Sequence, residues 1–156
     1  MAERPIKPVI LVPVDFSPTS KTALLEACEL ALCLKNPIVV LHVVHDPGAM
    51  PSYYANMVKK KHLVRIEDAA QEMFDSFMAT VIKENPELKL LKKAQRMLVT
   101  GIPVTRILQV GEKVNARMVV MGSRGLTGLQ HVMQGSVAQQ VVQLCPIPVT
   151  VVKAEK

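Results

Sequence analysis

Val9-Ile-Leu-Val-Pro-Val14 is a short, continuous apolar run, rich in β-branched residues, that ends at Asp15. Such runs are typical of strands buried inside a parallel sheet. Because Pro13 cannot donate to the ladder, we expect the strand to end or bend there. Ser17-Pro18 then predicts the start of a helix, with serine as the cap and proline in the first helical position.

Strand-like and helix-like segments alternate along the rest of the chain. Further strands are expected at residues 38–44, 94–100, 118–121 and 149–152, and the segment 94–100 is more polar than the first two strands, as is typical of a sheet edge. Helices are expected over 22–34, over a long amphipathic segment with apolar positions from 63 to 81 that ends before Asn85-Pro86, from Pro103, and from Gly135-Ser136. This alternation predicts an α/β fold, an open, doubly wound, five-stranded and mostly parallel sheet with helices on both faces.

Length and composition indicate one globular unit. The chain has 156 residues, of which 49% are hydrophobic and 21% charged, so we expect a single domain over residues 1–156. No apolar run approaches the ~18 residues that span a bilayer. The first residues, Met-Ala-Glu-Arg-Pro, do not resemble a signal peptide, so we expect a cytoplasmic location and no membrane partner.

Charge and cysteine content exclude further classes. The net charge is +6, but two Tyr, three Phe and no Trp argue against nucleic-acid binding by base stacking. The lysine clusters at 59–61 and 89–93 are interpreted as solvated helix ends. The three cysteines lack the spacing of a zinc site or a disulfide framework, so we expect buried, unreactive thiols.

A glycine-rich segment follows the fourth expected strand directly. Four of the seven glycines in the chain fall between Gly122 and Gly135. Glycine lets backbone amides approach an anion, and a helix that starts at Gly135-Ser136 adds free N–H groups and a favourable dipole. Ligands of doubly wound sheets bind beyond the carboxyl ends of the strands, so this position favours a phosphate cradle. The alternative is a long glycine-containing turn that binds nothing.

The better-known phosphate motifs are absent from the sequence. No G-x-x-x-x-G-K-[ST] occurs, and no G-x-G-x-x-G follows the first strand, which excludes a P-loop and argues against a dinucleotide site. A phospho-acceptor receiver domain would need an acidic pair after the first strand and an aspartate after the third. Asp15 and Thr100-Gly101 stand at those places, which excludes this class as well.

The spacing Gly122-x2-Gly125-x9-Gly135-Ser136 resembles the ATP-binding signature of the universal stress protein family. Segments 10–17, 41–44, 119–125 and 148–153 are similar to other parts of that family in the same order, so the resemblance covers nearly the whole chain. It implies a sheet with strand order 3-2-1-4-5 and an adenine-nucleotide site.

The resemblance also implies which residues contact the nucleotide. The ends of the first two strands contribute Pro13, Val14, Asp15 and Val43, the last through its backbone to the adenine edge. The end of the fourth strand and the following loop and helix contribute Met121, Gly122, Ser123, Arg124, Gly125, Gly135, Ser136, Val137 and Ala138. The implied cofactor is ATP, with Mg²⁺ or Mn²⁺ held mainly by the phosphates and not by a cage of protein ligands.

Several of these residues have a second interpretation. Asp15 could brace the turn before Ser17 instead of contacting a ligand, and Arg124 could be an ordinary loop cation. His42, inside a strand, is more often a hydrogen-bonded core histidine than a catalytic base. Ala138 stands where some ATP-binding relatives carry a hydroxyl residue.

The expected function is that of a nucleotide-dependent regulatory module for stress responses. One arginine and no acidic residue lie between Gly122 and Gln143, so we expect slow ATP hydrolysis at most. A weak ATPase or adenylyl-handling enzyme, and a dimer that acts by protein contacts without nucleotide, remain as alternatives. The last strand, 149–152, is short and apolar, and the resemblance implies a homodimer formed through it, with an unknown protein partner.

Overall fold

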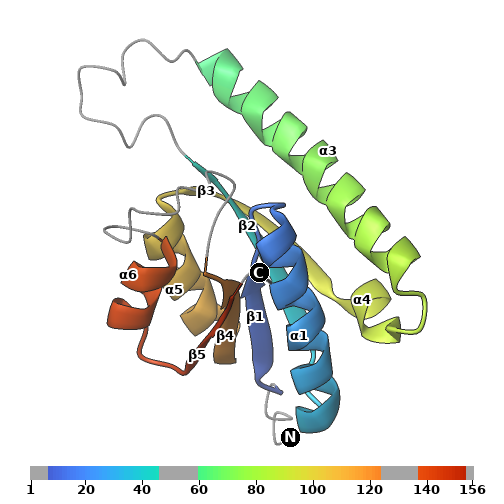
Figure 1. Ribbon diagram of the computed structural model, residues 1–156. Coiled ribbons are helices and arrows are strands. Elements are labelled where there is room, and N and C mark those ends of the chain that lie inside the picture. Colours follow the sequence, from blue (N-terminus) through green and yellow to red (C-terminus); the bar gives the residue numbers. More distant parts are fainter. Residues whose placement is uncertain (1–6, 46–59, 124–136, 154–156) are drawn as a thin grey trace, which may run out of the picture.

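Five parallel strands form one sheet in the computed structural model, which describes residues 7–45, 60–123 and 137–153. The order across the sheet is β3-β2-β1-β4-β5 (Figure 1), which confirms the predicted α/β fold and strand order. The strands are β1 (Val9–Pro13), β2 (Ile38–His45), β3 (Gln95–Gly101), β4 (Ala116–Gly122) and β5 (Val149–Val152).

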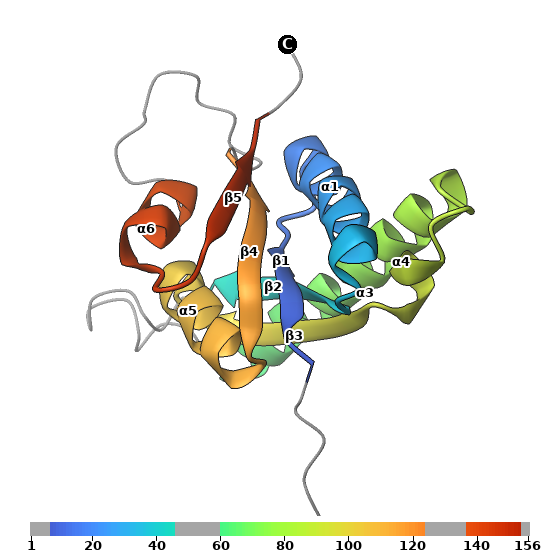
Figure 2. The same cartoon turned by 90° about the horizontal axis from the view of Figure 1, so that it is seen from below.

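Helices cover both faces of the sheet. They are α1 (Pro18–Leu34), α3 (Lys60–Glu84), α4 (Lys89–Lys93), α5 (Pro103–Lys113) and α6 (Val137–Leu144). Helices α1, α3 and α4 lie on one face and α5 and α6 on the other (Figure 2). This is the doubly wound arrangement that strands alternating with helices predict.

Alternate residues of the central strands belong to two separate hydrophobic cores, one on each face of the sheet. In β1, Ile10 and Val12 point to the core under α1 and α3, whereas Leu11 points to the core under α5. In β2, Val40 and Leu41 divide in the same way. All five are completely buried. Burial on both faces explains why the first strand is a continuous apolar run and not an alternating one.

The local signals at the element ends are confirmed. Strand β1 ends at Pro13. The Ser17 hydroxyl caps α1 by accepting a hydrogen bond from the Ser20 amide at 3.1 Å, and Pro18 occupies the first turn. Helix α3 ends at Glu84, immediately before Asn85-Pro86.

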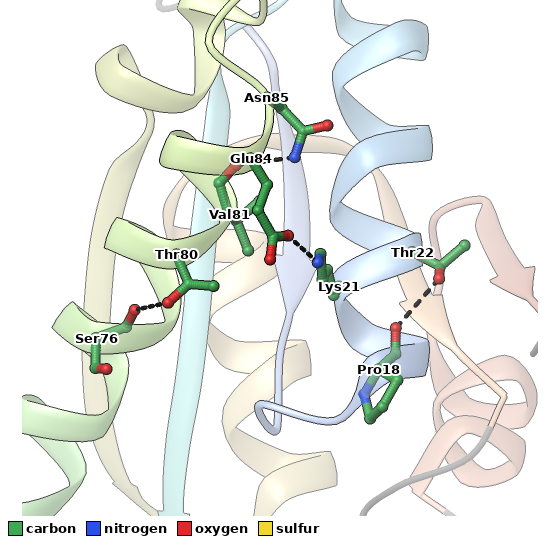
Figure 3. A network of polar contacts seen from close by, with 8 residues as sticks. All are labelled: Pro18, Lys21, Thr22, Ser76, Thr80, Val81, Glu84 and Asn85. Atoms are coloured by element: carbon green, nitrogen blue, oxygen red, sulfur yellow. Dashed lines mark hydrogen bonds and ion pairs between the residues drawn. The ribbon is translucent and has the colours of Figure 1, made fainter.

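Helix α3 is attached to the rest of the molecule mainly by an apolar stripe. Phe74, Met78 and Val81 are at most 1% exposed. Fully burying side chains of this size contributes roughly 1.5–3 kcal/mol each. A surface ion pair from Lys21 of α1 to Glu84 of α3 adds a polar link (Figure 3), but pairs this exposed are worth little.

Some sequence expectations differ from the structure. The short helix α4 was not predicted, and β4 begins two residues before its expected start at Met118. Strand β2 extends one residue beyond the expected range 38–44 and ends at His45. Cys28 is buried as expected, but Cys33 is exposed and Cys145 half-buried. Cys33 lies five positions after Cys28 in α1 and so points to a different side of the helix.

No helix among residues 7–45, 60–123 and 137–153 is both long and apolar enough to cross a membrane.

Candidate functional site

The strand order places a topological switch point between β1 and β4. From β1 the chain moves outward through β2 and β3, then returns to the other side of β1 with β4. In open α/β sheets, ligands bind in the crevice beyond the carboxyl ends of the two strands that flank such a reversal. Pro13 ends β1 and Gly122 ends β4. The candidate residues that follow these strands therefore stand on the two sides of the switch point.

The turn from β1 to α1, residues Val14–Ser17, is held by its own polar groups. The Val14 amide donates to the carbonyl of Leu41 in β2 at 2.8 Å. The carboxylate of Asp15 accepts a hydrogen bond from the Ser17 amide at 3.1 Å. Asp15 is half-buried. The bracing role weighed for Asp15 from the sequence is therefore present in the structure.

Phe16 occupies an unusual position in the same turn. Its φ is +66°, in the left-handed region that bulky side chains rarely adopt. Its ring stacks on the imidazole of His42, with centroids 4.2 Å apart and planes 29° from parallel. Phe74 and Phe77 of α3 complete the aromatic cluster, at 5.9 and 5.5 Å from Phe16.

His42 connects β2 to this turn. Its Nδ1 lies 2.8 Å from the carbonyl oxygen of Val14. Burial lowers the pKa of His42 below 6.5, although the Val14 hydrogen bond and the negative charge of Asp15 act in the opposite direction. His42 is thus the hydrogen-bonded histidine that its strand position suggested, and its partner is the candidate site's own turn.

Gly122 lies against the first turn of α1. A Cβ at this position would stand 2.8 Å from Cγ2 of Thr19 and 3.3 Å from the amide nitrogen of Ser20. Close packing of β4 against α1 therefore requires glycine here, independently of any anion. The next residue, Ser123, donates its amide to the carbonyl of Val152 in β5 at 2.8 Å, which fixes where the glycine-rich segment leaves the sheet.

Val43, Met121 and Ala138 share the α5–α6 side of the sheet. Met121 is 5% exposed and Ala138 is 7% exposed, so both side chains are part of the hydrophobic core under α5 and α6. Val43 is half-buried and packs against the same core. Val137, the first residue of α6, is 36% exposed.

The other candidate residues, Arg124, Gly125, Gly135 and Ser136, lie outside the described part of the chain. At the carboxyl ends of the strands, the described residues offer the Asp15 carboxylate as a hydrogen-bond acceptor, whereas the amides of Val14 and Ser123 donate to Leu41 and Val152. Among the residues that the structure describes, no three His, Cys, Asp or Glu side chains are grouped so that they could hold a metal ion. A carboxylate such as that of Asp15 can accept hydrogen bonds from hydroxyl groups.

Two features of the site were not predicted from the sequence. One is the contact between Phe16 and His42, and the other is the contact between Gly122 and Thr19. Both join segments far apart in the chain, so neither has a local pattern. The only available signal was the bulky residue between Asp15 and the cap Ser17.

Residues 8–153 match the model of the universal stress protein family. The chain is 30% identical to universal stress protein YxiE of Bacillus subtilis, with 92% of this chain and 97% of that protein covered. It is 25% identical to universal stress protein MJ0577 of Methanocaldococcus jannaschii, with 92% and 93% covered.

Solved structures share the fold. Universal stress protein UspA of Lactobacillus plantarum superposes with a TM-score of 0.71 at 21% identity, over 96% of this chain and 99% of that one. A universal stress protein solved in complex with cAMP has a TM-score of 0.64 at 18% identity, over 94% and 97%. One from Archaeoglobus fulgidus, solved in complex with dAMP, has a TM-score of 0.58 at 23% identity, over 95% and 99%. Because residues 8–153 match the family model, the chain belongs to the universal stress protein family.

Proposed function

We propose that this chain, as a single domain over residues 1–156, binds an adenine nucleotide at the carboxyl edge of its sheet and acts in the cytoplasm as a nucleotide-dependent regulatory module. The observation that carries the proposal is the switch point, where the Asp15 turn and the Gly122-Ser123 strand end stand on opposite sides of the strand reversal. Two proteins of the same fold that were solved with cAMP and dAMP support adenine as the base. The glycine spacing favours ATP within this class.

Each candidate residue then has a role that its chemistry allows. The Asp15 carboxylate accepts hydrogen bonds from ribose hydroxyls, flanked by Pro13 and Val14, and the backbone of Val43 pairs with the adenine edge. Met121 contributes through its backbone, since its side chain is 5% exposed. The phosphates are held by side chains, backbone amides and the start of α6, through Gly122, Ser123, Arg124, Gly125, Gly135, Ser136, Val137 and Ala138. Of these, Ser123 contributes its hydroxyl, since its amide donates to Val152.

The side chains of Asp15 in the β1–α1 turn and of His42 in β2 favour binding over catalysis. Asp15 accepts from the Ser17 amide, and His42 is hydrogen-bonded to Val14, so both titratable groups already hold the backbone. A phosphoryl-transfer catalyst needs a group that orients the nucleophile and carboxylates that hold the metal. We therefore infer slow hydrolysis at most, with Mg²⁺ or Mn²⁺ held mainly by the phosphates.

Calorimetric titration with ATP, with and without Mg²⁺, tests the proposal. Wild type should bind with micromolar or tighter affinity, and Asp15→Asn should weaken binding by about tenfold or more, because it removes a charged hydrogen-bond acceptor. Asp68→Asn, on the exposed side of α3, is the matched control. The double substitution Gly125→Val and Ser136→Ala tests the sequence motif separately. Absence of heat with ATP, ADP, AMP and cAMP would reject nucleotide binding.

We also propose that two copies of the chain pair through β5. This strand is at the sheet edge, hydrogen-bonded to β4 on one side. Val151 of this strand is 37% exposed, and α6, which contacts β5, carries Val142 and Leu144 at 51% and 61% exposure. An edge strand next to exposed apolar side chains is a template for a second copy.

A further inference from the structure

We propose that His42 is a positioning residue for the nucleotide site: its Nδ1 hydrogen bond and its stacked ring hold the turn Val14–Ser17, and with it the Asp15 carboxylate, in the shape that the nucleotide requires. This inference rests on the proposed function, because it assigns a role toward that same site. It concerns a side chain of β2 that belongs to none of the implied contact positions.

The turn has a conformation that needs support from outside. Phe16 has a φ of +66°, and a bulky residue stays in the left-handed region only where its surroundings hold it there. The surroundings are the ring of His42 at 4.2 Å and, farther away, the rings of Phe74 and Phe77. Of these three rings, only His42 is also hydrogen-bonded to the turn. Loss of the stack would release Phe16 toward ordinary backbone conformations.

The hydrogen bond determines the state of the imidazole. A backbone carbonyl can only accept, so Nδ1 of His42 must carry the proton that it shares with the Val14 oxygen at 2.8 Å. The Val14 amide donates to Leu41 at 2.8 Å, so β2 holds both polar groups of this peptide segment. The Asp15 carboxylate accepts a hydrogen bond from the amide of Ser17, the residue that follows Phe16.

Two neighbours in the chain help to place Asp15. Val14 before it is fixed to β2 by Leu41 and His42, and Phe16 after it is fixed by the His42 ring. One side chain acts on both flanks of the residue proposed to bind ribose. Without His42, Asp15 would keep its carboxylate but lose its fixed place, which lowers affinity through lost preorganisation.

Two substitutions separate the two contacts of His42. His42→Phe keeps an aromatic ring for stacking but has no donor for Val14, whereas His42→Asn keeps a donor but has no ring. His45→Phe, on the exposed end of the same strand, is the matched control. If His42→Phe fails to fold, Phe16→Leu removes the stack and leaves the His42 hydrogen bond in place.

The first measurement is hydrogen exchange of the Ser17 amide by NMR without ligand. His42→Phe removes the hydrogen bond to Val14, and exchange of the Ser17 amide should then be about fivefold faster. The increase should be smaller in His42→Asn, and His45→Phe should exchange like the wild type. Unchanged exchange in His42→Phe would overturn the inference. This measurement decides the positioning role even if the wild type binds no adenine nucleotide, a result that would reject the proposed function instead.

The second measurement is the ATP dissociation constant in a double-mutant cycle with Asp15→Asn. His42→Phe should weaken ATP binding about fivefold in the wild-type background and less than about twofold in the Asp15→Asn background. Phe16→Leu, which removes only the stack, should weaken binding less in the wild-type background and not at all in the Asp15→Asn background. Equal weakening in both backgrounds would mean that His42 acts independently of Asp15. That result would overturn the inference and leave nucleotide binding intact.

Discussion

Gly122 shows how one position can satisfy a binding motif and a packing requirement together. It is the first glycine of the family spacing, yet the added Cβ would stand 2.8 Å from the Thr19 side chain and 3.2 Å from the Thr19 backbone. Contacts below 3.0 Å force something to move, and the first turn of α1 is held by the Ser17 cap. The glycine would therefore be required even in a protein of this fold that had no ligand.

This packing predicts opposite results for two Gly→Ala substitutions. Gly122→Ala should lower the free energy of unfolding by about 1–3 kcal/mol, as overpacking does. Gly111→Ala, inside α5, places its Cβ at an ordinary 3.6 Å from Leu11 and should stabilise by up to about 1 kcal/mol through helix propensity. Urea unfolding of both variants measures the difference. Equal effects would contradict the packing account.

His42 predicts a pH dependence of stability. Its pKa in the folded protein is below the ordinary 6.5, chiefly because of burial, so the unfolded chain takes up the proton first as pH falls. The stability is complete above about pH 6.5 and is lost as pH falls from there through the folded pKa. The charged group acting on His42 is Asp15, while Phe16 and Phe74 present apolar rings to it.

Urea unfolding at a series of pH values from 5 to 8 tests this sign. The free energy of unfolding should decrease below pH 6.5 in the wild type. In His42→Asn that decrease should be smaller, because asparagine does not titrate. An identical pH profile for the two proteins would show that other groups are responsible.

At the scale of elements, α3 allows apolar and ionic attachments to be compared directly. Phe74 is completely buried, whereas the side chains of the Lys21–Glu84 pair are 34% and 48% exposed. Phe74→Ala should cost about 3–5 kcal/mol of stability. Lys21→Met should cost less than about 1 kcal/mol, and that cost should shrink on adding salt, because salt screens an exposed ion pair. A larger cost for Lys21→Met would contradict the dominance of the apolar stripe.

The sequence predicts elements well where the local signal is strong. The end of β1 at Pro13, the cap at Ser17 and the end of α3 before Asn85-Pro86 all depend on residues within a few positions of each other, and all are confirmed. Ala116 and Arg117, which open β4, carry no strong apolar pattern, so the start of that strand was missed.

Features formed by distant segments could not be predicted in this way. His42 and Val14 are 28 residues apart in the chain. Gly122 at the end of β4 lies against Thr19 in the first turn of α1. Helix α4 has five residues, too few to show a helical period. Cys33 was expected to be a buried thiol because the cysteine spacing fits neither a zinc site nor a disulfide, but it lies five positions from the buried Cys28 on α1 and is exposed.

At the scale of the whole molecule, the proposed dimer gives a direct prediction. Val151→Lys places a charge on the exposed edge strand, and a lysine there blocks pairing of edges. The wild type should sediment as a dimer at micromolar concentration and Val151→Lys as a monomer. Leu32→Lys, at a 55% exposed position on α1, should leave the dimer intact. A monomeric wild type would contradict pairing through β5.

The central claim, that an adenine nucleotide binds at the β1–β4 switch point, is a claim about location as well as affinity. All strands of a parallel sheet begin at one end of the sheet and finish at the other. In doubly wound sheets the ligand crevice lies beyond the end where the strands finish, the carboxyl edge. Asn36 and Asn115 precede β2 and β4, so they lie at the opposite end of the sheet, the amino edge, where the strands begin. A method that reports on individual amides can distinguish the two.

The most direct test is therefore an NMR titration of the isotope-labelled wild-type protein with ATP and Mg²⁺, followed through backbone amide shifts. The account predicts saturable shifts at Val14, Asp15, Val43, Ser123 and Val137, with Asn36 and Asn115 unchanged. Shifts confined to the amino edge, or no saturable shift at millimolar ATP, would contradict it.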